Sequence, residues 1–156
     1  MSNTQSTKTS WNIYLAGEIH SDWRHQIESG CHDAGLPVIF SAPVTDHAAS
    51  DACGTDILGD EDNPFWADHK GAKINAIRTH THIKQADVVV VRFGEQYRQW
   101  NAALDAGYAA ALGTPIIVLH PDEHRHALKE IDAAALAVAA TSEQVVEILR
   151  YVINNK

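Results

Sequence analysis

Residues 86–120 read ADVVVVRFGEQYRQWNAALDAGYAAALGTPIIVLH, and this stretch decides the fold class. Its first part, residues 87–93, contains an uninterrupted run of four valines, which is typical of a strand buried on both faces of a parallel sheet. A helix rich in small residues is predicted from about 99 to 112 and ends at Gly113, a common helix stop. Residues 116–119 form another apolar run. The stretch therefore predicts a strand, helix, strand unit with a parallel crossover.

The helix of this unit carries a single carboxylate, Asp105, among Ala, Leu and Tyr. Asp is a poor residue inside a helix, and burying its charge is costly unless a partner compensates it. Asn101 lies four residues earlier and shares a helix face with Asp105. Near a helix N-terminus the ionised carboxylate is favoured, which is what a nucleophile needs. An ion pair with Arg98, or with another chain, is the structural alternative.

The preceding residues predict two further strands. Residues 11–16 (WNIYLA) form an apolar run that Gly17 closes. Ser21 and Asp22 then provide a hydroxyl cap and an acid for the start of a helix that ends at Gly35. A short apolar run at residues 36–41 suits a buried strand.

The remaining segments vary in their periodicity. Residues 43–69 show no period, and we expect a long irregular region there, with at most one short helical turn, that is functional or mobile. A helix is predicted at 70–84, a strand at 135–140, and a final amphipathic helix capped by Ser142. The alternation predicts an α/β fold with three layers (α/β/α) around a mainly parallel five-stranded sheet.

The length and composition favour one domain. A chain of 156 residues is enough for a single core, so we expect a disordered tail at 1–10 and one domain at 11–156. The tail does not resemble a signal peptide, and no stretch approaches the ~20 apolar residues of a membrane span. Cys31 and Cys53 are expected to be free thiols in a reducing cytosol, which predicts a cytoplasmic protein.

The net charge of the chain indicates which class of ligand it binds. The formal net charge is −8, and no cluster of Lys and Arg occurs. Nucleic-acid binding depends on neutralising phosphates, so this composition argues against a nucleic-acid partner. A small molecule is the more plausible ligand, and no membrane partner is predicted.

In a parallel sheet, ligands bind beyond the carboxyl ends of the strands. Glu18 follows the first strand and Glu95 follows the strand at 87–93, so either could face Asp105 across a small ligand. Retaining glycosyl chemistry needs two carboxyl groups ~5 Å apart. For both glutamates, a solvated loop position is the alternative. Tyr14 and Tyr108 could offer rings to a base or hydroxyls to a sugar.

Several other chemistries are disfavoured. Neither the dinucleotide fingerprint nor the phosphate-binding loop pattern occurs, and the ten histidines lack zinc-ligand spacing. No cofactor and no metal are therefore predicted. Glu18 and Asp22 would repel a phosphate from the first helix, which favours a nucleoside over a nucleotide.

Two longer motifs carry a family resemblance. Residues 16–24 (AGEIHSDWR) and 93–101 (FGEQYRQWN) resemble the YtoQ family, which is grouped with the nucleoside 2-deoxyribosyltransferases. DAGYA at 105–109, followed by GTP, resembles a motif of the transferases. The resemblance covers nearly the whole chain from Ile13. It implies a flavodoxin-like fold, cleavage of an N-glycosidic bond through a covalent sugar ester, and a homo-dimer or larger homo-oligomer with sites near subunit boundaries.

The transferase nucleophile is a Glu, and Asp105 stands at its position. Asp105, Glu18 and Glu95 are therefore the candidate catalytic residues. The candidate substrate-binding residues are Tyr14, Gly17, His20, Ser21, Asn101 and Tyr108.

The chain departs from the transferases at two further positions. Gln99 stands six residues before Asp105, where they carry a carboxylate, and no Asp stands near His80. We expect an enzyme that cleaves or exchanges the base of a nucleoside-like N-glycoside. A catalytically silent module that binds a nucleoside or a nucleotide-derived metabolite is the alternative. A nucleotide N-glycosidase would additionally need Arg residues converging on a phosphate.

Overall fold

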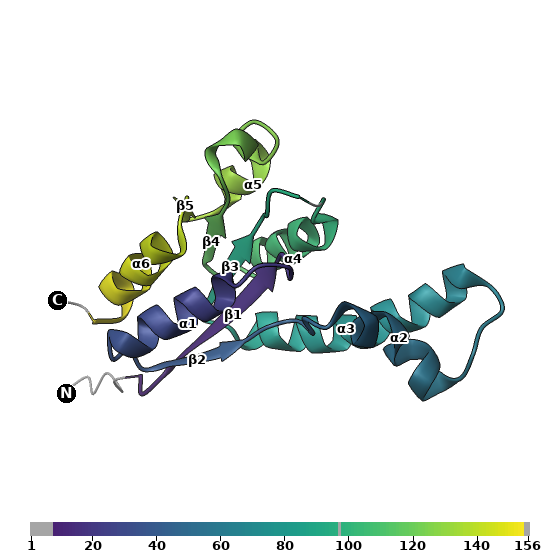
Figure 1. The fold of residues 1–156 in the computed structure, drawn as a ribbon. Coiled ribbons are helices and arrows are strands. Elements are labelled where there is room, and N and C mark those ends of the chain that lie inside the picture. Colours follow the sequence, from purple (N-terminus) through teal and green to yellow (C-terminus); the bar gives the residue numbers. More distant parts are fainter. Residues whose placement is uncertain (1–7, 97, 155–156) are drawn as a thin grey trace.

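Five parallel strands form the centre of the computed structural model, which describes residues 8–96 and 98–154 (Figure 1). Their order, β2-β1-β3-β4-β5, is that of a flavodoxin-like sheet. All the pairings are parallel, so the predicted fold class is confirmed. The strands are β1 (Trp11–Gly17), β2 (Val38–Ser41), β3 (Val88–Arg92), β4 (Ile116–Leu119) and β5 (Ala137–Ala139).

Helices cover both faces of this sheet. The side chains of β1 alternate: Ile13 and Leu15 join the core on the side of α1 and α6, whereas Tyr14 and Ala16 join the core beneath α4. Alternation along a strand thus directs Tyr14 toward the face that carries Asp105. The helices are α1 (Trp23–Asp33), α2 (His47–Leu58), α3 (Pro64–Gln85), α4 (Trp100–Ala111), α5 (Lys129–Ala134) and α6 (Ser142–Asn154), with a short 3-10 helix, η1 (Asp122–His124).

The prediction of an irregular region at 43–69 was wrong, because α2 and the first turns of α3 occupy much of it. The two helices approach closely through glycines. A Cβ on Gly54 would lie 2.3 Å from the backbone nitrogen of Gly71. Such an interface needs small residues and leaves no apolar period for a sequence reading to detect. The Asp46 side chain accepts from the Ala49 N–H and caps α2, and Asn63 with Pro64 begins α3.

The α2–α3 hairpin extends away from the sheet (Figure 1). Phe65 and Trp66 lie exposed at its tip, and Lys70 pairs with Glu61 across the connecting turn, with 2.6 Å between Nζ and Oε1. None of the helices described is long and apolar enough to cross a membrane.

At the other end of the domain, Lys8 forms an ion pair with Asp87 and lies over the Trp11 ring. Residues 1–7 of the predicted tail lie outside the described residues. Cys31 is buried and Cys53 is half-buried, and both are free thiols.

Candidate active site

Asp105 lies in the second turn of α4, on the flank between the buried stripe of the helix and its exposed stripe. Burial raises the pKa of its carboxyl from 3.8 to about 6. The Arg98 guanidinium lies 5.9 Å from the centre of the Trp100 ring. Among residues 8–96 and 98–154, no hydrogen bond or ion pair to the Asp105 carboxylate is found. Its charge is therefore uncompensated within the described part of the chain.

Tyr14 is the neighbour whose ionisation Asp105 affects. Its side chain is fully buried, and burial raises the pKa of its hydroxyl to about 12. The neighbouring Thr79 side chain lowers this pKa and the charge of Asp105 raises it, but the approach of Thr79 does not reach the distance and angle of a hydrogen bond, and no other described residue bonds the Tyr14 Oη. A buried phenol without a partner, beside an uncompensated carboxylate, is costly for folding. This pairing is typical of a functional site.

Two histidines of α3 flank this pair. The His80 ring stacks on Tyr108 with 4.4 Å between the ring centres, and Tyr108 follows Asp105 by one helical turn. The His82 ring stacks on Tyr14 at 5.9 Å, and burial followed by the charge of Arg78 lowers the pKa of His82. From the sequence, surface or hydrogen-bonding roles are favoured for these histidines over metal binding. Their two-residue spacing puts them on opposite sides of a helix, so it gave no sign that both rings stack on tyrosines near Asp105.

Glu18 belongs to a second cluster, at the carboxyl end of β1. Its carboxylate accepts from the backbone N–H groups of His20 and Ser21, and from the Ser21 hydroxyl at 2.5 Å. Burial alone would raise the pKa of Glu18, but these hydrogen bonds and Arg92 outweigh it and lower the pKa. Ser21 therefore does not cap α1 as predicted, and α1 has no side-chain cap. The arrangement favours an ionised, anchored carboxylate over a proton donor.

The ends of β1 and β3 touch at two glycines. A Cβ on Gly17, whose φ is 107°, would lie 2.1 Å from the Arg92 carbonyl oxygen, and one on Gly94 would lie 2.5 Å from the Glu18 side chain. The Nε of Arg92 and the Nε2 of Gln99 are buried here without hydrogen-bond partners. The loops that follow β1 and β3 therefore meet at this edge of the sheet, and Gly17 contributes to the contact through its backbone.

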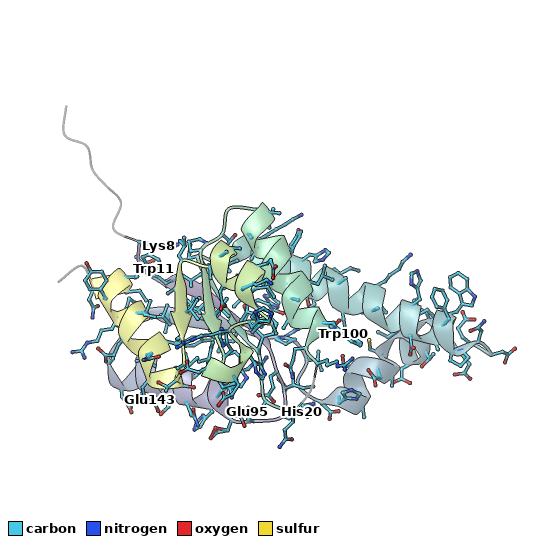
Figure 2. All side chains as sticks on the ribbon, turned by 90° about the horizontal axis from the view of Figure 1, so that it is seen from above. Lys8, Trp11, His20, Glu95, Trp100 and Glu143 are labelled. Atoms are coloured by element: carbon cyan, nitrogen blue, oxygen red, sulfur yellow. The ribbon has the colours of Figure 1, made fainter. Side chains whose placement is uncertain are left out.

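Glu95 is exposed in the loop after β3. The Gln99 side chain accepts from the Gly94 N–H at 3.1 Å, and His124 Nε2 lies 3.1 Å from the Gly94 carbonyl, so both ends of this segment are anchored. Figure 2 shows Glu95 and His20 along the same side of the molecule. Asn101, in the first turn of α4, is also exposed.

A cleft of about 580 Å³ opens where α1, the end of β2 and α3 meet. Arg24, Arg78 and His82 are among its lining residues, so the fold gathers arginines that lie far apart in the sequence. The Arg24 guanidinium is already bound to the carbonyls of Leu15, Gly17 and Glu18. His82 connects the cleft to Tyr14.

The predicted site residues thus form two clusters. Asp105, Tyr14 and Tyr108 lie together between α4, β1 and α3, whereas Glu18, Ser21 and Gly17 lie at the end of β1. Within the described part of the chain, no group of three or more His, Cys, Asp or Glu side chains is arranged to hold a metal ion.

Comparison with known proteins identifies the family. Residues 14–153 match the family described as "Nucleoside 2-deoxyribosyltransferase YtoQ". The chain belongs to the YtoQ family. The uncharacterised YtoQ protein of Bacillus subtilis (strain 168) is 41% identical over 139 residues, which cover 89% of this chain and 94% of that protein.

Solved structures share the fold of this YtoQ protein. A conserved protein from Enterococcus faecalis V583 matches with a TM-score of 0.63 and 15% identity, covering 92% of this chain and 99% of the other. A 2-deoxyribosyltransferase from Bacillus psychrosaccharolyticus matches with a TM-score of 0.52 and 19% identity, covering 86% and 90%. At these identities the likeness concerns the fold alone.

Proposed function

We propose that this member of the YtoQ family cleaves or exchanges the base of a nucleoside-like N-glycoside, with Asp105 as the nucleophile. The observation that carries the proposal is the half-buried Asp105 carboxylate, without a cation or hydrogen-bond donor among the described residues, beside the unpartnered Tyr14 hydroxyl. With a pKa of about 6, the carboxylate is mostly ionised at neutral pH. It is also poorly solvated, which makes it a better nucleophile than an exposed carboxylate.

The reaction has two steps, which form and then break down a covalent glycosyl ester. A carboxylate oxygen of Asp105 attacks C1′ of the sugar and forms a glycosyl ester, while the bond from C1′ to the base nitrogen breaks and the base leaves with a proton. Water or a second base then attacks C1′ and gives up a proton to the group that protonated the leaving base, while the bond from C1′ to the Asp105 oxygen breaks and releases the carboxylate. In this proposal the Tyr14 hydroxyl donates a hydrogen bond to the carboxylate or to the sugar, and Asn101 and Tyr108 contact the substrate from the same helix, α4.

The proton for the leaving base needs a group that can give one up. Glu18 suits this role poorly, because its hydrogen bonds hold it ionised. The exposed candidates are Glu95, after β3, and His80, whose ring stacks on Tyr108. Of the candidate binding residues on the β1 loop, Gly17, His20 and Ser21 would hold the ligand from the side of the Glu18 cluster.

The proposed substrate class follows from the family and from the absence of a phosphate motif. The description of the family and that of the Bacillus psychrosaccharolyticus enzyme both name deoxyribosyl transfer, which supports a nucleoside. Because Arg78 borders the neighbouring cleft, nucleoside monophosphates belong in any substrate panel. We further propose that the protein acts in the cytoplasm, as a homo-oligomer, and without nucleic acid.

The test is release of free base from nucleosides, deoxynucleosides and their monophosphates, comparing the parent protein with Asp105→Asn. We expect the parent protein to release free base from at least one substrate and Asp105→Asn to release none. Binding without release from any member of the panel, by a well-folded parent, would contradict the proposal and favour a silent binding module.

A further inference from the structure

The cleft of about 580 Å³ between α1, the end of β2 and α3 takes no part in the reaction steps described above. Its volume lies within the range of pockets that hold small molecules. The lining combines an apolar wall with hydroxyl groups and a cation from α3, which are supplied by Phe40, Pro43, Ser41, Thr45 and Arg78. A pocket of this composition suits a polar organic molecule that carries an anionic group.

Arg78 is a cation of this cleft that lacks a carboxylate partner. Its Nη2 donates to the Ala42 carbonyl at 3.3 Å, and within the described part of the chain no ion pair joins its guanidinium to a carboxylate. A guanidinium carries five N–H donors in a planar fork that matches the geometry of a phosphate. Most of the Arg78 donors therefore remain available to a ligand in the cleft.

Arg24 adds a second positive charge to the wall of the cleft. Its side chain is buried, and its guanidinium donates to the carbonyls of Leu15, Gly17 and Glu18. Burial lowers the pKa of Arg24 to about 10, and the charge of Glu18 opposes this effect. The guanidinium stays protonated at neutral pH, so it contributes a fixed positive charge beside the cleft.

Two carboxylates at the start of α1 were expected to repel a phosphate. Glu18 does not line the cleft, because its carboxylate is held by the N–H groups of its own loop. Asp22 lines the cleft from the α1 side, where its side chain accepts from Gln26 at 3.1 Å. Glu28 lies on the same side, and its charge raises the pKa of Arg24. Arg78 approaches from α3, so the opposite wall is the place for an anion.

The cleft is linked to the proposed nucleophile through Tyr14. Burial has the largest effect on the pKa of the Tyr14 hydroxyl. Asp105 also raises this pKa, whereas Arg24 and Arg78 lower it. His82 lines the cleft and stacks on the Tyr14 ring at 5.9 Å. Charges interact over roughly 10 Å at ordinary ionic strength, so the carboxylate and the cations lie within reach of one nucleotide-sized ligand.

We propose that the N-glycoside bound by this protein carries a phosphate monoester on its sugar, and that Arg78 binds this phosphate in the cleft while C1′ lies at Asp105. This inference rests on the proposed function and names its substrate class, a nucleoside 5′-monophosphate. A phosphate at the 5′ position extends away from C1′ on an exocyclic carbon, so the reacting atom and the anion occupy the two ends of the ligand. The Arg78 fork holds two phosphate oxygens, and Arg24 strengthens binding through its charge.

Isothermal titration of the full chain tests this assignment through binding, with the common deoxynucleosides, their 5′-monophosphates and inorganic phosphate as ligands. Where a ligand is cleaved, Asp105→Asn is used so that binding is measured without turnover. At least one monophosphate should bind about 30-fold more tightly than its nucleoside. Arg78→Gln should abolish most of this difference and leave the affinity for the nucleoside unchanged. Arg150→Gln removes the same charge from α6, where Arg150 pairs with Glu147, and should change neither affinity.

Circular dichroism establishes that each variant is folded. Should Arg78→Gln fail to fold, Arg78→Lys keeps the charge but loses the planar fork, and it should weaken monophosphate binding about 5-fold. Equal affinity for a nucleoside and its monophosphate overturns the proposal, as does tighter monophosphate binding that survives the change at Arg78. Inorganic phosphate that binds as tightly as the monophosphates would indicate a simple anion site and would also overturn it.

The outcome is separable from that of the proposed reaction. Monophosphate binding that depends on Arg78, without release of base, would contradict the reaction and support the phosphate site. Release of base from nucleosides, with no monophosphate bound at concentrations up to about 10 mM, would support the reaction and overturn the phosphate site.

Discussion

The Asp105 carboxylate on α4 acts on the buried Tyr14 hydroxyl of β1, and it raises the pKa of that phenol beyond the effect of burial. The two side chains lie on the same face of the sheet because alternation along β1 directs Tyr14 beneath α4. Each is costly in its place, since one is a poorly solvated carboxylate and the other a phenol without a partner. Such a pair lowers the stability of the fold, and residues that cost stability in this way are typical of functional sites.

The rate of base release should depend on the ionisation of Asp105. Since burial raises its pKa to about 6, the ionised fraction falls as the pH drops through that value. We expect kcat/KM to be constant above about pH 7 and to fall about tenfold per pH unit well below 6. A profile of kcat/KM against pH measures this. An acid limb with its midpoint near pH 4 would contradict an Asp105 nucleophile in a buried setting.

Asp105→Asn should stabilise the fold at high pH. The folded-state pKa lies above the unfolded value of 3.8, so between these values the folded state binds more protons and loses stability as the pH rises. The loss is complete above the folded pKa. A shift of about 2 units, reduced for partial exposure, corresponds to about 2 kcal/mol.

Urea unfolding at pH 8 and at pH 4 tests this prediction. Asp105→Asn should raise the free energy of unfolding at pH 8 and change it little at pH 4. The exposed Asp56→Asn serves as the control and should change the free energy of unfolding little at either pH. An equal gain from Asp105→Asn at both values would mean that charge burial is not its cause.

Tyr14→Phe should separate stability from activity. Removing a buried hydroxyl that has no hydrogen-bond partner is expected to leave stability unchanged or raise it by up to about 1 kcal/mol. If the hydroxyl donates to the reacting groups, kcat/KM should fall about 10- to 100-fold. Thermal unfolding and base release measure the two effects, with Tyr151→Phe, at an exposed tyrosine of α6, as the control. A loss of stability together with unchanged activity would assign Tyr14 to the core alone.

The sequence predicted the sheet well, because buried parallel strands leave a local signal. The valines of β3 and the helix stop at Gly113 are evident without tertiary information. The α2–α3 hairpin was missed because its contact is made through Gly54 and Gly71. A glycine contact leaves the same local pattern as a flexible loop.

Only some residues of the candidate site carry a signal in the local sequence. Asp105 stood out because a carboxylate among alanines is locally costly, and Tyr14 because it lies in a predicted strand. The approach of His80 and His82 to these residues depends on how α3 lies across the sheet, which no local pattern reveals. The hydrogen bonds that Glu18 accepts within its own loop were missed for a similar reason. Two of its partners are backbone N–H groups, which nearly every residue carries, so the sequence gives no sign of them.

Glu18→Gln should destabilise the fold at neutral pH. The carboxylate accepts hydrogen bonds from Ser21 and His20 and lies 3.5 Å from Arg92, so we expect a loss of about 2 kcal/mol. Because the folded-state pKa is lowered, this stabilisation is present above the unfolded pKa and disappears as the pH falls through the folded value. The difference between parent and Glu18→Gln should therefore shrink in acid, which unfolding curves at pH 7 and pH 3 would reveal.

Gly54→Ala should loosen the α2–α3 hairpin and leave the sheet intact. The new Cβ would lie 2.3 Å from the Gly71 nitrogen and 2.6 Å from the Lys70 carbonyl carbon, and backbone atoms cannot move aside as a flexible side chain can. We expect faster hydrogen exchange in α2 and the first turns of α3, with protection of β1 and β3 unchanged. Gly107→Ala, measured in dilute solution, is the matched control, because its Cβ meets nothing and a mid-helix Ala is favoured by about 1 kcal/mol. Unchanged exchange in the hairpin of Gly54→Ala would mean that the two helices can separate slightly at no cost.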